Sequence, residues 1–521
     1  MRLHDYFDFC AREFPDLDFA ILGDRRLTYR EAQGEVNRLA NAFVGAGLQP
    51  GDRMAMLSKN SIEYAVMYFA ASKAGIVPVP VNYRLAADAW TYIMNDAQAK
   101  LVMASAAYVD AVNSFRGELQ TATTFISIGA GAVDGWLDYR SWIEDRPATP
   151  PDRHVRVDDD VYQMYTSGTT GRPKGAVLTH GAVSANLTQV EPIARAAPGE
   201  RFLIVAPLYH AAAAVTAFSC VKWAGTLYIQ EDFNPVEVAR ALDEEKIVCA
   251  MLVPAMIQAL LVYVPDIAQR RYDALRTIIY GASPIAEQTL RRSIEVFKCG
   301  FAQAYGMTET TAALTALLPH HHEAALTGQP HLLLSAGRPL VGVELRVVDE
   351  HDELVPAGAV GEIVARGPNL MRGYWNLPDE SAEALRGGWM HTGDAGYLDK
   401  DGFLYIQDRV KDMIVSGGEN VYPRTIEDVL FKHPAIADAA VIGVPDQTWG
   451  ETVKAIVVLK EGQRATEEEI IEFCKDKLGG FERPRSVDFA PVLPRNATGK
   501  VLKKELRAPY WTDRGRQVAG V

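Results

Sequence analysis

The sequence has few cysteines, and they lie far apart along the chain. The five are Cys10, Cys220, Cys249, Cys299 and Cys474, an odd number with no paired spacing. A disulfide framework or a zinc site normally shows paired or closely spaced cysteines, so neither is expected. We therefore expect the chain to work in a reducing compartment, the cytoplasm.

The sequence also lacks the apolar segments that export a protein or anchor it in a membrane. Near the N-terminus, Asp5, Asp8 and Glu13 interrupt the stretch that a signal peptide would need. The longest uncharged run, residues 202–221, has about the length of a membrane span, but Pro207 and several polar residues break it up. We expect this run to form a buried strand, a loop and a buried helix, and we expect no transmembrane segment.

Basic residues are not in excess. The chain has 53 Lys and Arg against 66 Asp and Glu, a formal net charge of −13, whereas a nucleic-acid-binding surface normally needs a basic excess. Nucleic acid is therefore not the expected partner. With 521 residues, of which 48% are hydrophobic and 23% charged, the chain should be globular and too long for one compact core. We expect more than one domain.

Helix and strand patterns alternate in the N-terminal part of the chain. Helical patterns cover residues 29–46 and 61–74, and strand patterns cover residues 53–57 and 76–80. Such alternation predicts parallel βαβ units. A similar alternation over residues 201–307 predicts a second α/β layer.

The pattern changes in the last third of the chain. Residues 337–405 consist of short runs separated by turn residues, which predicts a small β-rich unit. Residues 409–521 contain 18 Lys and Arg against 17 Asp and Glu, whereas residues 1–408 contain 35 against 49. This shift in charge predicts a domain boundary near residue 408, with one domain over residues 1–408 and another over residues 409–521.

The strongest chemical signal is a loop rich in glycine and hydroxyl residues. Residues 165–175 read YTSGTTGRPKG. Glycines let backbone N–H groups approach anionic oxygens, the hydroxyl groups add donors, and Lys174 supplies a positive charge. The loop is not a Walker A motif, because no Gly-Lys-Ser/Thr follows at the required spacing. It predicts a phosphate-binding loop of another kind.

Six further motifs follow this loop in a fixed order. They are PLYH at 207–210, YGASP at 280–284, YGMTE at 305–309, TGD at 392–394, DRVKDMIVSGGENVYP at 408–423 and PRNATGK at 494–500. The ordered set resembles the adenylate-forming superfamily, which comprises acyl-CoA synthetases, adenylation domains of peptide synthetases and beetle luciferases. The resemblance implies an α/β fold with a large N-terminal domain of two α/β subdomains plus a small β-barrel subdomain, followed by a small mobile α+β C-terminal domain.

The resemblance also implies a reaction in two steps. A carboxylate attacks the α-phosphorus of Mg-ATP and gives an acyl-adenylate and pyrophosphate, after which the thiol of CoA attacks the adenylate. Because one anion attacks another, we expect most of the catalysis to come from fixed charges and from positioning. The implied enzyme is an AMP-forming carboxylate–CoA ligase, typical of fatty acid metabolism, that uses ATP, CoA and Mg²⁺.

Catalytic and nucleotide-binding roles are carried over from the matching motifs. Lys500 is expected to bridge the substrate carboxylate and the α-phosphate, and Glu309 to bind Mg²⁺ with help from Thr166. Asp394 and Arg409 are expected to hold the ribose. Each residue alone would be read as a surface or ion-pair residue, so these roles rest on the resemblance. The other residues expected to bind ATP or AMP are Ser167, Gly168, Thr169, Thr170, Gly171, Lys174, Gly281, Ala282, Ser283, Tyr305, Gly306, Met307, Thr308 and Ile406.

The segment after Arg409 is implied to serve the second step. Lys411 occupies the superfamily's hinge position, about which the C-terminal domain turns between the two half-reactions. The loop that follows is expected to line the CoA pantetheine tunnel. Its expected CoA-binding residues are Ser416, Gly417, Gly418 and Glu419.

The segments expected to line the acyl pocket carry no charge apart from Glu309. A charged substrate tail would stay unpaired there, so an apolar acid is expected, although the sequence does not distinguish a fatty acid from an aryl acid. His210 is a candidate gate between the acyl site and the CoA tunnel, with a buried, hydrogen-bonded histidine as the alternative. The expected pocket residues are Tyr209, Ala211, Val215, Gly281 and Gly306.

Two alternatives stay open, a related ligase and a protein of a different class. An acyl-AMP ligase would load a carrier-protein thiol instead of CoA. A non-catalytic nucleotide-binding regulator would be expected to lack Lys500, Glu309 or Lys174, and all three are present.

Three consecutive histidines, residues 320–322, follow Pro319 in what we expect to be a loop, and we expect no metal there. A homodimer is a further open alternative.

Overall fold

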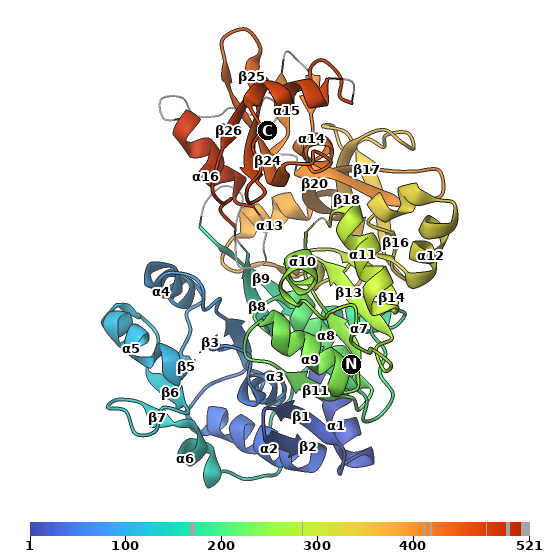
Figure 1. Cartoon of the computed structure of the whole chain (residues 1–521). Coiled ribbons are helices and arrows are strands. Elements are labelled where there is room, and N and C mark those ends of the chain that lie inside the picture. The colour runs from blue at the N-terminus through green and yellow to red at the C-terminus, as the bar shows by residue number, and fades with distance from the viewer. Residues whose placement is uncertain are drawn as a thin grey trace.

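The structure is a computed structural model that describes residues 1–166, 172–283, 285–409, 412–416, 419–475, 477–495 and 501–511. Within these ranges the strands form five sheets. The C-terminal sheet lies at one end of the molecule, and the N-terminal five-stranded sheet lies on one side of the other end (Figure 1).

A five-stranded parallel sheet forms the outer α/β layer, in the order β4-β3-β5-β6-β7. Its neighbouring helix α3 is buried along its whole length. That helix begins after Ser61, whose side chain accepts a hydrogen bond from the Tyr64 N–H, and ends at Gly75 with a left-handed φ of 72°. The strands are β3 (Arg53–Leu57), β4 (Val77–Pro80), β5 (Leu101–Ser105), β6 (Thr124–Ile128) and β7 (Leu137–Asp138).

A nine-stranded sheet forms the second layer, in the order β16-β15-β14-β13-β12-β10-β11-β1-β2. The six strands from β14 to β1 in this order run parallel, and antiparallel strands close both edges. The strands are β1 (Asp18–Leu22), β2 (Arg25–Thr28), β10 (Arg201–Ile204), β11 (Thr226–Ile229), β12 (Ile247–Met251), β13 (Thr277–Gly281), β14 (Gly300–Tyr305), β15 (Thr315–Leu317) and β16 (Arg338–Pro339).

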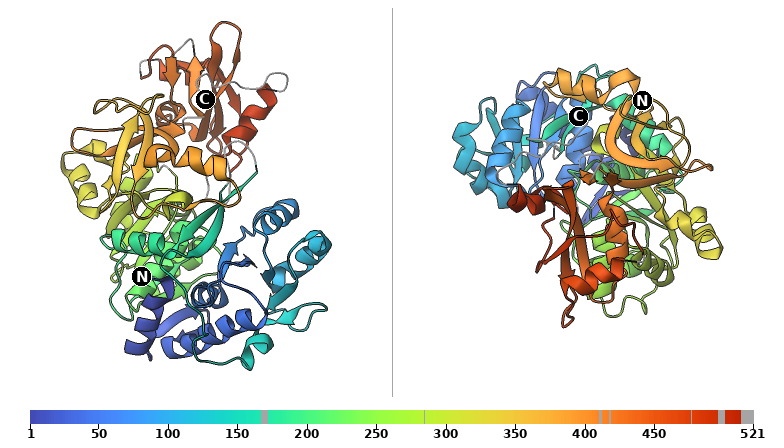
Figure 2. Two further views of the ribbon diagram at one scale, coloured as in Figure 1. Left: turned by 180° about the vertical axis from the view of Figure 1, so that it is seen from behind. Right: turned by 90° about the horizontal axis from the view of Figure 1, so that it is seen from above.

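A three-stranded antiparallel sheet, β19-β9-β8, lies between the two layers. Its strand β8 contacts β4 of the outer layer. The view from behind shows β8 and β9 reaching from the body of the molecule toward the C-terminal unit (Figure 2). The strands are β8 (Asp160–Thr166), β9 (Lys174–Thr179) and β19 (Gly373–Tyr374).

The β-rich unit predicted over residues 337–405 is present, but the predicted barrel is not closed among the described residues. Its strands form an open antiparallel sheet in the order β17-β18-β20-β21. Within the described ranges the outer strands β17 and β21 do not pair with each other, and the far side of β21 makes an isolated bridge from Leu404 to Gly337. The strands are β17 (Glu344–Val348), β18 (Gly361–Arg366), β20 (Met390–Leu398) and β21 (Leu404–Arg409).

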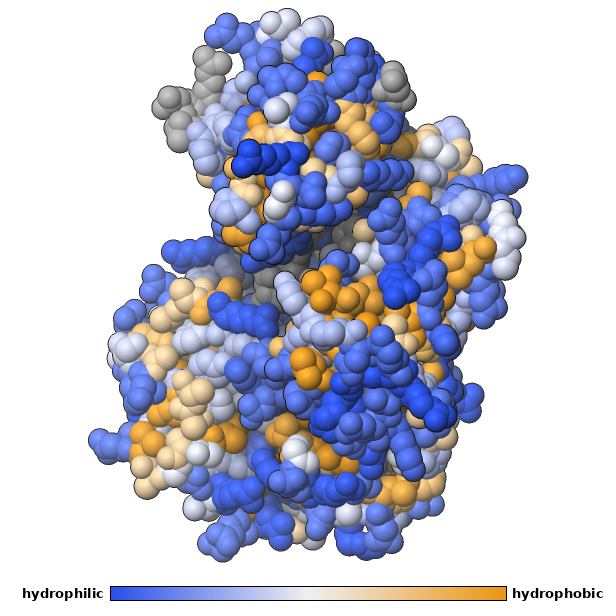
Figure 3. All heavy atoms as spheres, in the orientation of Figure 1, coloured by the Kyte–Doolittle hydropathy of each residue, from blue (hydrophilic) through white to orange (hydrophobic). Residues whose placement is uncertain are grey.

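The last sheet has the order β23-β22-β25-β24, and β26 pairs with β25. All its strands lie after the predicted boundary near residue 408, which stays a prediction. In the space-filling view the surface narrows between this unit and the rest of the chain (Figure 3). The strands are β22 (Ile414–Ser416), β23 (Glu419–Val421), β24 (Ile436–Asp446), β25 (Gly450–Leu459) and β26 (Ser486–Phe489).

The five cysteines are free, and all except the half-buried Cys299 are buried.

The helices cover the faces of these sheets. Within the described ranges, no helix has the length and apolar character needed to cross a membrane. The helices are α1 (Leu3–Glu13), α2 (Tyr29–Gly45), α3 (Ile62–Ala74), α4 (Ala87–Asp96), α5 (Ala106–Phe115), α6 (Tyr139–Glu144), α7 (His180–Gln189), α8 (Ala211–Lys222), α9 (Pro235–Glu244), α10 (Pro254–Tyr263), α11 (Glu287–Phe297), α12 (Pro319–Thr327), α13 (Pro378–Ala384), α14 (Pro423–Leu430), α15 (Glu467–Cys474) and α16 (Lys503–Arg507).

The predicted elements of the N-terminal part agree with the structure to within one residue at each end, as α2, β3, α3 and β4. The uncharged run 202–221 forms β10, a loop and α8, as predicted. The prediction of a loop at the three histidines is wrong, because α12 begins at Pro319. Proline fits the first position of a helix, where its missing N–H costs no hydrogen bond.

Candidate active site

The predicted motifs meet at one edge of the nine-stranded sheet. The parallel strands β10, β12, β13 and β14 end at Ile204, Met251, Gly281 and Tyr305. Carboxyl ends of parallel strands lie at the same edge, and open α/β sheets bind their ligands outside that edge. PLYH begins shortly after the end of β10, and YGASP and YGMTE begin in the last residues of β13 and β14, so the topology brings the three segments together.

A buried carboxylate lies above this edge. Asp394 of β20 is 6% exposed. Its Oδ2 accepts a hydrogen bond of 2.8 Å from the Tyr305 hydroxyl, and its Oδ1 lies 2.6 Å from Arg409 Nε. The negative charge of Asp394 raises the pKa of the half-buried Arg409 guanidinium. Three of the predicted nucleotide-binding residues therefore form one connected group, drawn from β14, β20 and β21.

Ile406 lies on β21 next to this group. Its side chain packs against a small buried cluster, Ala336, Ile363 and Leu404, on which Tyr305 also packs. The side chain of Tyr305, at the end of β14, therefore packs against residues of the four-stranded sheet.

A second buried carboxylate belongs to Glu309, in a short 3₁₀ helix of residues Thr308–Thr310. Glu309 is 4% exposed. Its Oε1 accepts hydrogen bonds from the Tyr374 hydroxyl at 2.9 Å and from the Thr166 hydroxyl at 3.4 Å. Burial raises the pKa of Glu309, although the hydrogen bonds oppose the shift. The expected pair of Thr166 and Glu309 is in contact.

Tyr374 is a site residue that the sequence did not reveal. Its hydroxyl donates to Glu309, and its ring lies 5.2 Å from Lys174 Nζ. Tyr374 thus joins the predicted magnesium residue to the predicted phosphate-binding lysine. No spacing in the sequence signals this contact, because Tyr374 is separated from Glu309 by 65 positions and lies on a two-residue strand.

Glycines at the strand ends allow the backbones to approach closely. A Cβ on Gly281 would lie 2.2 Å from the Ala304 carbonyl oxygen, and one on Gly306 would lie 2.3 Å from the Ala312 carbonyl oxygen. Ala282 follows with a φ of 64°, in the left-handed region that is unfavourable for alanine. Such strain is common at ligand-binding sites. Of the remaining predicted residues, Ser283 follows in the same segment, and Met307 and Thr308 follow Gly306.

Helix α4 holds both ends of the phosphate loop. The Tyr165 hydroxyl, before the loop, donates to Asp96 Oδ2 at 2.5 Å, and the Tyr92 hydroxyl donates at 3.2 Å to the carbonyl oxygen of Pro173, after the loop. The Arg172 guanidinium lies 5.0 Å from the Tyr92 ring. The five-stranded layer therefore fixes the two stems of this loop.

His210 lies immediately before α8, at the end of the PLYH segment. Its buried Nε2 has no hydrogen-bond partner in the described part of the chain. Burial and the nearby Arg84 charge lower the pKa of His210 to about 4, so the ring is neutral near pH 7. Ala211 and Val215 of α8 are buried. The ring of Tyr209 packs edge-on against Tyr83, at 5.4 Å, in the core of the outer layer.

Of the segment predicted to bind CoA, residues 416–419, the structure describes the two ends. Ser416 ends β22 and pairs in register with Glu419 of β23, whose side chain lies outside the described part. Several predicted residues lie outside the described residues altogether: Ser167, Gly168, Thr169, Thr170, Gly171, Lys411, Gly417, Gly418 and Lys500.

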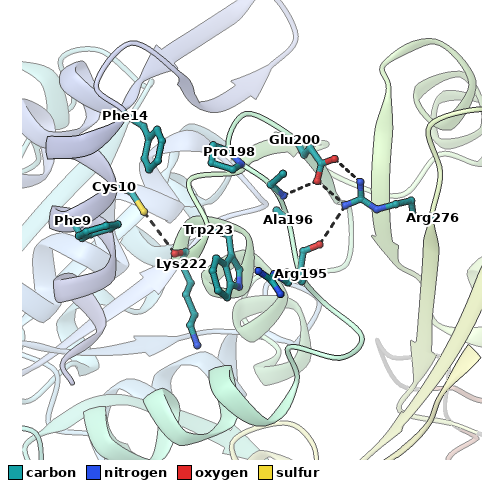
Figure 4. Close-up of a pocket in the computed structure, with 11 residues that line it drawn as sticks. Phe9, Cys10, Phe14, Arg195, Ala196, Pro198, Glu200, Lys222, Trp223 and Arg276 are labelled. Atoms are coloured by element: carbon teal, nitrogen blue, oxygen red, sulfur yellow. Dashed lines mark hydrogen bonds and ion pairs between the residues drawn. The ribbon is translucent and has the colours of Figure 1, made fainter.

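A cavity of about 680 Å³ lies at the opposite edge of the sheet and contains none of the predicted residues (Figure 4). Its lining includes residues 195–198 and Glu200 before β10, and Lys222 and Trp223 at the end of α8. In it the Arg195 guanidinium lies 4.6 Å from the Trp223 ring, and Glu200 pairs with Arg276. The chemistry of the motifs is therefore at the carboxyl edge, away from this cavity.

Comparison with known proteins gives two family matches. The model of the AMP-binding enzyme family matches residues 7–375, and the model of the AMP-binding enzyme C-terminal domain matches residues 425–500. A feruloyl-CoA synthase of an Amycolatopsis species is 37% identical over 501 residues, covering 96% of this chain and 97% of that protein. A fatty acid–[acyl-carrier-protein] ligase of Streptomyces coeruleorubidus is 37% identical over 519 residues, covering 98% and 96%.

Solved structures share the same fold. ATP-bound MatB from Rhodopseudomonas palustris superposes with a TM-score of 0.87 at 28% identity, covering 98% of this chain and 99% of that one. The agreement extends over both the large N-terminal part and the C-terminal sheet.

Proposed function

Because the chain belongs to the AMP-binding enzyme family, we propose that it is a ligase that activates an apolar carboxylic acid as its acyl-adenylate and transfers the acyl group to CoA, releasing AMP and pyrophosphate. One observation carries the proposal: the Tyr305–Asp394–Arg409 group and the Thr166–Glu309–Tyr374 group both lie at the carboxyl edge of the parallel strands. Two preorganised buried carboxylates there suit a nucleotide sugar and a phosphate-bound cation.

In this proposal the first group binds the nucleoside. The Asp394 carboxylate accepts hydrogen bonds from the ribose hydroxyls, and Arg409 donates to the same sugar. The Tyr305 ring and the backbone of residues 281–283 flank the adenine, because the glycine at position 281 removes the side chain that would otherwise stand there. Lys174 and the loop before it contact the phosphates.

The residues around Glu309 fit Mg²⁺. A carboxylate beside the Thr166 hydroxyl offers the oxygen ligands that this cation prefers. Among the described residues no group of three or more His, Cys, Asp or Glu could hold a metal ion, so most ligands would come from the nucleotide phosphates and water, as is usual for this cation. Bound there, Mg²⁺ would neutralise phosphate charge, while Tyr374 and Thr166 orient the Glu309 carboxylate toward it.

Lys500 and the hinge complete the proposed cycle. Lys500 bridges the substrate carboxylate and the α-phosphate, where negative charge develops during attack. Rotation about Lys411 then brings the loop from Ser416 to Glu419 to the adenylate, so that the CoA thiol reaches it. His210, neutral because of burial, separates the acyl site from the path of the thiol in this proposal.

The acid is apolar in this proposal. Ala211 and Val215, at the start of α8, are buried and uncharged, and a charged substrate tail beside them would lack a partner. A feruloyl-CoA synthase and a fatty-acid ligase are equally similar to this chain, at 37% identity. Both aryl and fatty acids therefore belong in the test.

A second candidate function follows from the second of these relatives. The fatty acid–[acyl-carrier-protein] ligase is aligned over 98% of this chain, and its name gives a carrier protein as the acceptor. An acyl-AMP ligase that loads a carrier-protein thiol would use the same adenylation residues. The two functions differ only in whether free CoA supports turnover.

Acid-dependent exchange of labelled pyrophosphate into ATP tests the adenylation step. The purified chain with Mg-ATP should show exchange that depends on one class of acid in a panel of straight-chain and aryl carboxylic acids. Amino acids should support no exchange. Silence with every acid of the panel would refute the proposal.

A further inference from the structure

The segment that carries Asp394 is a bulge in β20. In the β18–β20 ladder, Glu362 pairs with Ala395 and Val364 pairs with His391. Between these two pairs, β18 has one residue, Ile363, whereas β20 has three, residues 392–394. The two extra residues push the chain out of the ladder. Bulges of this kind turn side chains toward active sites, and here the last residue of the bulge is Asp394.

The bulge leaves backbone N–H groups without ladder partners, and side chains supply the acceptors. Gly393, at a φ of 66°, donates its N–H to Glu362 Oε1 at 3.0 Å. The Asp394 N–H donates to the Thr392 hydroxyl oxygen at 3.1 Å, and that hydroxyl donates to the Ile363 carbonyl at 2.6 Å. Glu362 is therefore the one carboxylate among these acceptors.

Glu362 is itself held in place from its other oxygen. His391 Nδ1 donates to Oε2 at 2.9 Å, and an Arg386 N–H donates to the same oxygen at 3.3 Å. Burial would raise the pKa of Glu362, but His391 and the Gly393 N–H lower it below its ordinary value, so the carboxylate is ionised near neutral pH. An ionised acceptor makes a stronger hydrogen bond to a backbone N–H than a neutral one.

We propose that Glu362 is a positioning residue for nucleotide binding: its carboxylate fixes the bulge of residues 392–394 and thereby keeps Asp394 directed at the ribose hydroxyls. The inference rests on the proposed role of Asp394. Glu362 does not touch the nucleotide, and it acts through the Gly393 N–H. His391 and Arg386 orient the carboxylate through its other oxygen, Oε2.

The test compares ATP with 2′-deoxyATP and 3′-deoxyATP in acid-dependent adenylation. If Asp394 holds the ribose, the wild type should prefer ATP in kcat/KM by about 10- to 100-fold, the value of one or two charged hydrogen bonds. Glu362→Ala should reduce this preference to about threefold or less and raise the KM for ATP about tenfold, with the KM for the acid unchanged. Glu362→Gln keeps an acceptor for the Gly393 N–H and should retain most of the preference.

Two further variants separate positioning from folding. Gly393→Ala leaves Glu362 in place but strains the same bulge, since a Cβ there meets no atom within 4 Å and only the left-handed φ opposes it; it should lose the same preference. Glu344→Ala removes an exposed ion pair with Arg366 on the same sheet, outside the bulge, and it should behave as the wild type. Thermal unfolding of each variant is measured alongside.

The outcomes distinguish a failure of the proposed role of Asp394 from a failure of the proposed role of Glu362. A wild type that uses both deoxynucleotides as well as ATP would refute the role of Asp394, and this inference with it. A wild type that discriminates, together with a Glu362→Ala variant that discriminates equally well, would overturn the inference and leave the role of Asp394 intact. A variant with a lowered melting temperature and unchanged discrimination would have the same meaning, because Glu362 would then only stabilise the fold.

Discussion

Asp394 and Glu309 are almost fully buried, and neighbours from other strands hold each of them in one orientation. In such surroundings an electrostatic interaction is stronger than in water, and an unpaired charge is costly. Asp394 has a cation, Arg409, at 2.6 Å, whereas the side chains that donate to Glu309 among the described residues are the hydroxyl groups of Tyr374 and Thr166. The raised pKa of Glu309 is therefore consistent with a carboxylate that binds a cation.

Removal of the Tyr374 hydroxyl tests that reading of Glu309. In Tyr374→Phe the Glu309 carboxylate loses its shorter hydrogen bond and becomes less well oriented. We expect adenylation to need a severalfold higher Mg²⁺ concentration and kcat/KM to fall about tenfold, the cost of one charged hydrogen bond. Tyr397→Phe is the matched control, because Tyr397 stacks on Tyr405 in the four-stranded sheet. Equal Mg²⁺ dependence in all three proteins would contradict the prediction.

Lys500 is tested by separating the two half-reactions. If it stabilises charge on the α-phosphate, Lys500→Ala should slow adenylation by about 10²- to 10⁴-fold, or about 3 to 5 kcal/mol. Thioester formation from a supplied acyl-adenylate should stay largely intact. Stopped-flow or quench measurements of each half-reaction check this. Equal loss in both would show that Lys500 does not act in the first step alone.

At the scale of elements, α1 and α7 are joined through two buried histidines. His180 Nδ1 accepts a hydrogen bond of 3.1 Å from the Leu3 N–H, and the rings of His4 and His180 lie 6.1 Å apart. Burial lowers the pKa of His4 to about 4 and that of His180 to about 3. In the unfolded chain both would titrate near about 6.5, so the unfolded state binds more protons at acidic pH.

This arrangement predicts acid-sensitive stability. The contribution of the histidines is fully present above about pH 6.5 and is lost as the pH falls toward the lowered values, by about 1.4 kcal/mol per pH unit for each group. His180→Asn can still accept from the Leu3 N–H and does not titrate. The free energy of unfolding in urea should therefore fall less for this variant between pH 7 and pH 5, by about 2 kcal/mol. Parallel pH profiles for the two proteins would count against it.

The elements were predictable where periodicity is local. The helix after Thr28 and the strand β3 follow from the spacing of apolar residues, and the carboxyl-edge site follows from motifs at strand ends. The loop predicted at Pro319 was wrong because proline both ends and begins helices. Tyr374 and Glu362 could not be predicted, since each acts through a partner 29 or more positions away, and sequence spacing carries no such information.

At the scale of the whole molecule, α16 ties the C-terminal unit to the segment on both sides of Lys411. Lys503 Nζ lies 3.2 Å from Asp408 and 2.9 Å from Glu427, and an Arg507 N–H lies 2.8 Å from Asp412. Burial lowers the pKa of Lys503, but the two carboxylates raise it above its ordinary value. These pairs join strand β21 to the C-terminal unit in the conformation of this structure.

If the unit turns about Lys411 between the half-reactions, a rigid residue there should separate them. Proline fixes φ near about −65°, so Lys411→Pro should keep acid-dependent pyrophosphate exchange within about threefold of the wild type. Acyl-CoA formation should fall by at least about 100-fold, because the second orientation is blocked. Lys411→Ala, which leaves φ free, is the control. Survival of both half-reactions in the proline variant would place the hinge elsewhere.

In the proposed reaction the chain forms a thioester at the expense of ATP, which is cleaved to AMP. The most direct measurement is the product balance of the purified protein with Mg-ATP and its preferred acid, with and without CoA, by chromatography of nucleotides and acyl-CoA. We expect one AMP for each acyl-CoA, no ADP, and multiple turnovers only when CoA is present. Adenylate formation that CoA does not relieve would contradict it and favour a carrier-protein thiol as the acceptor.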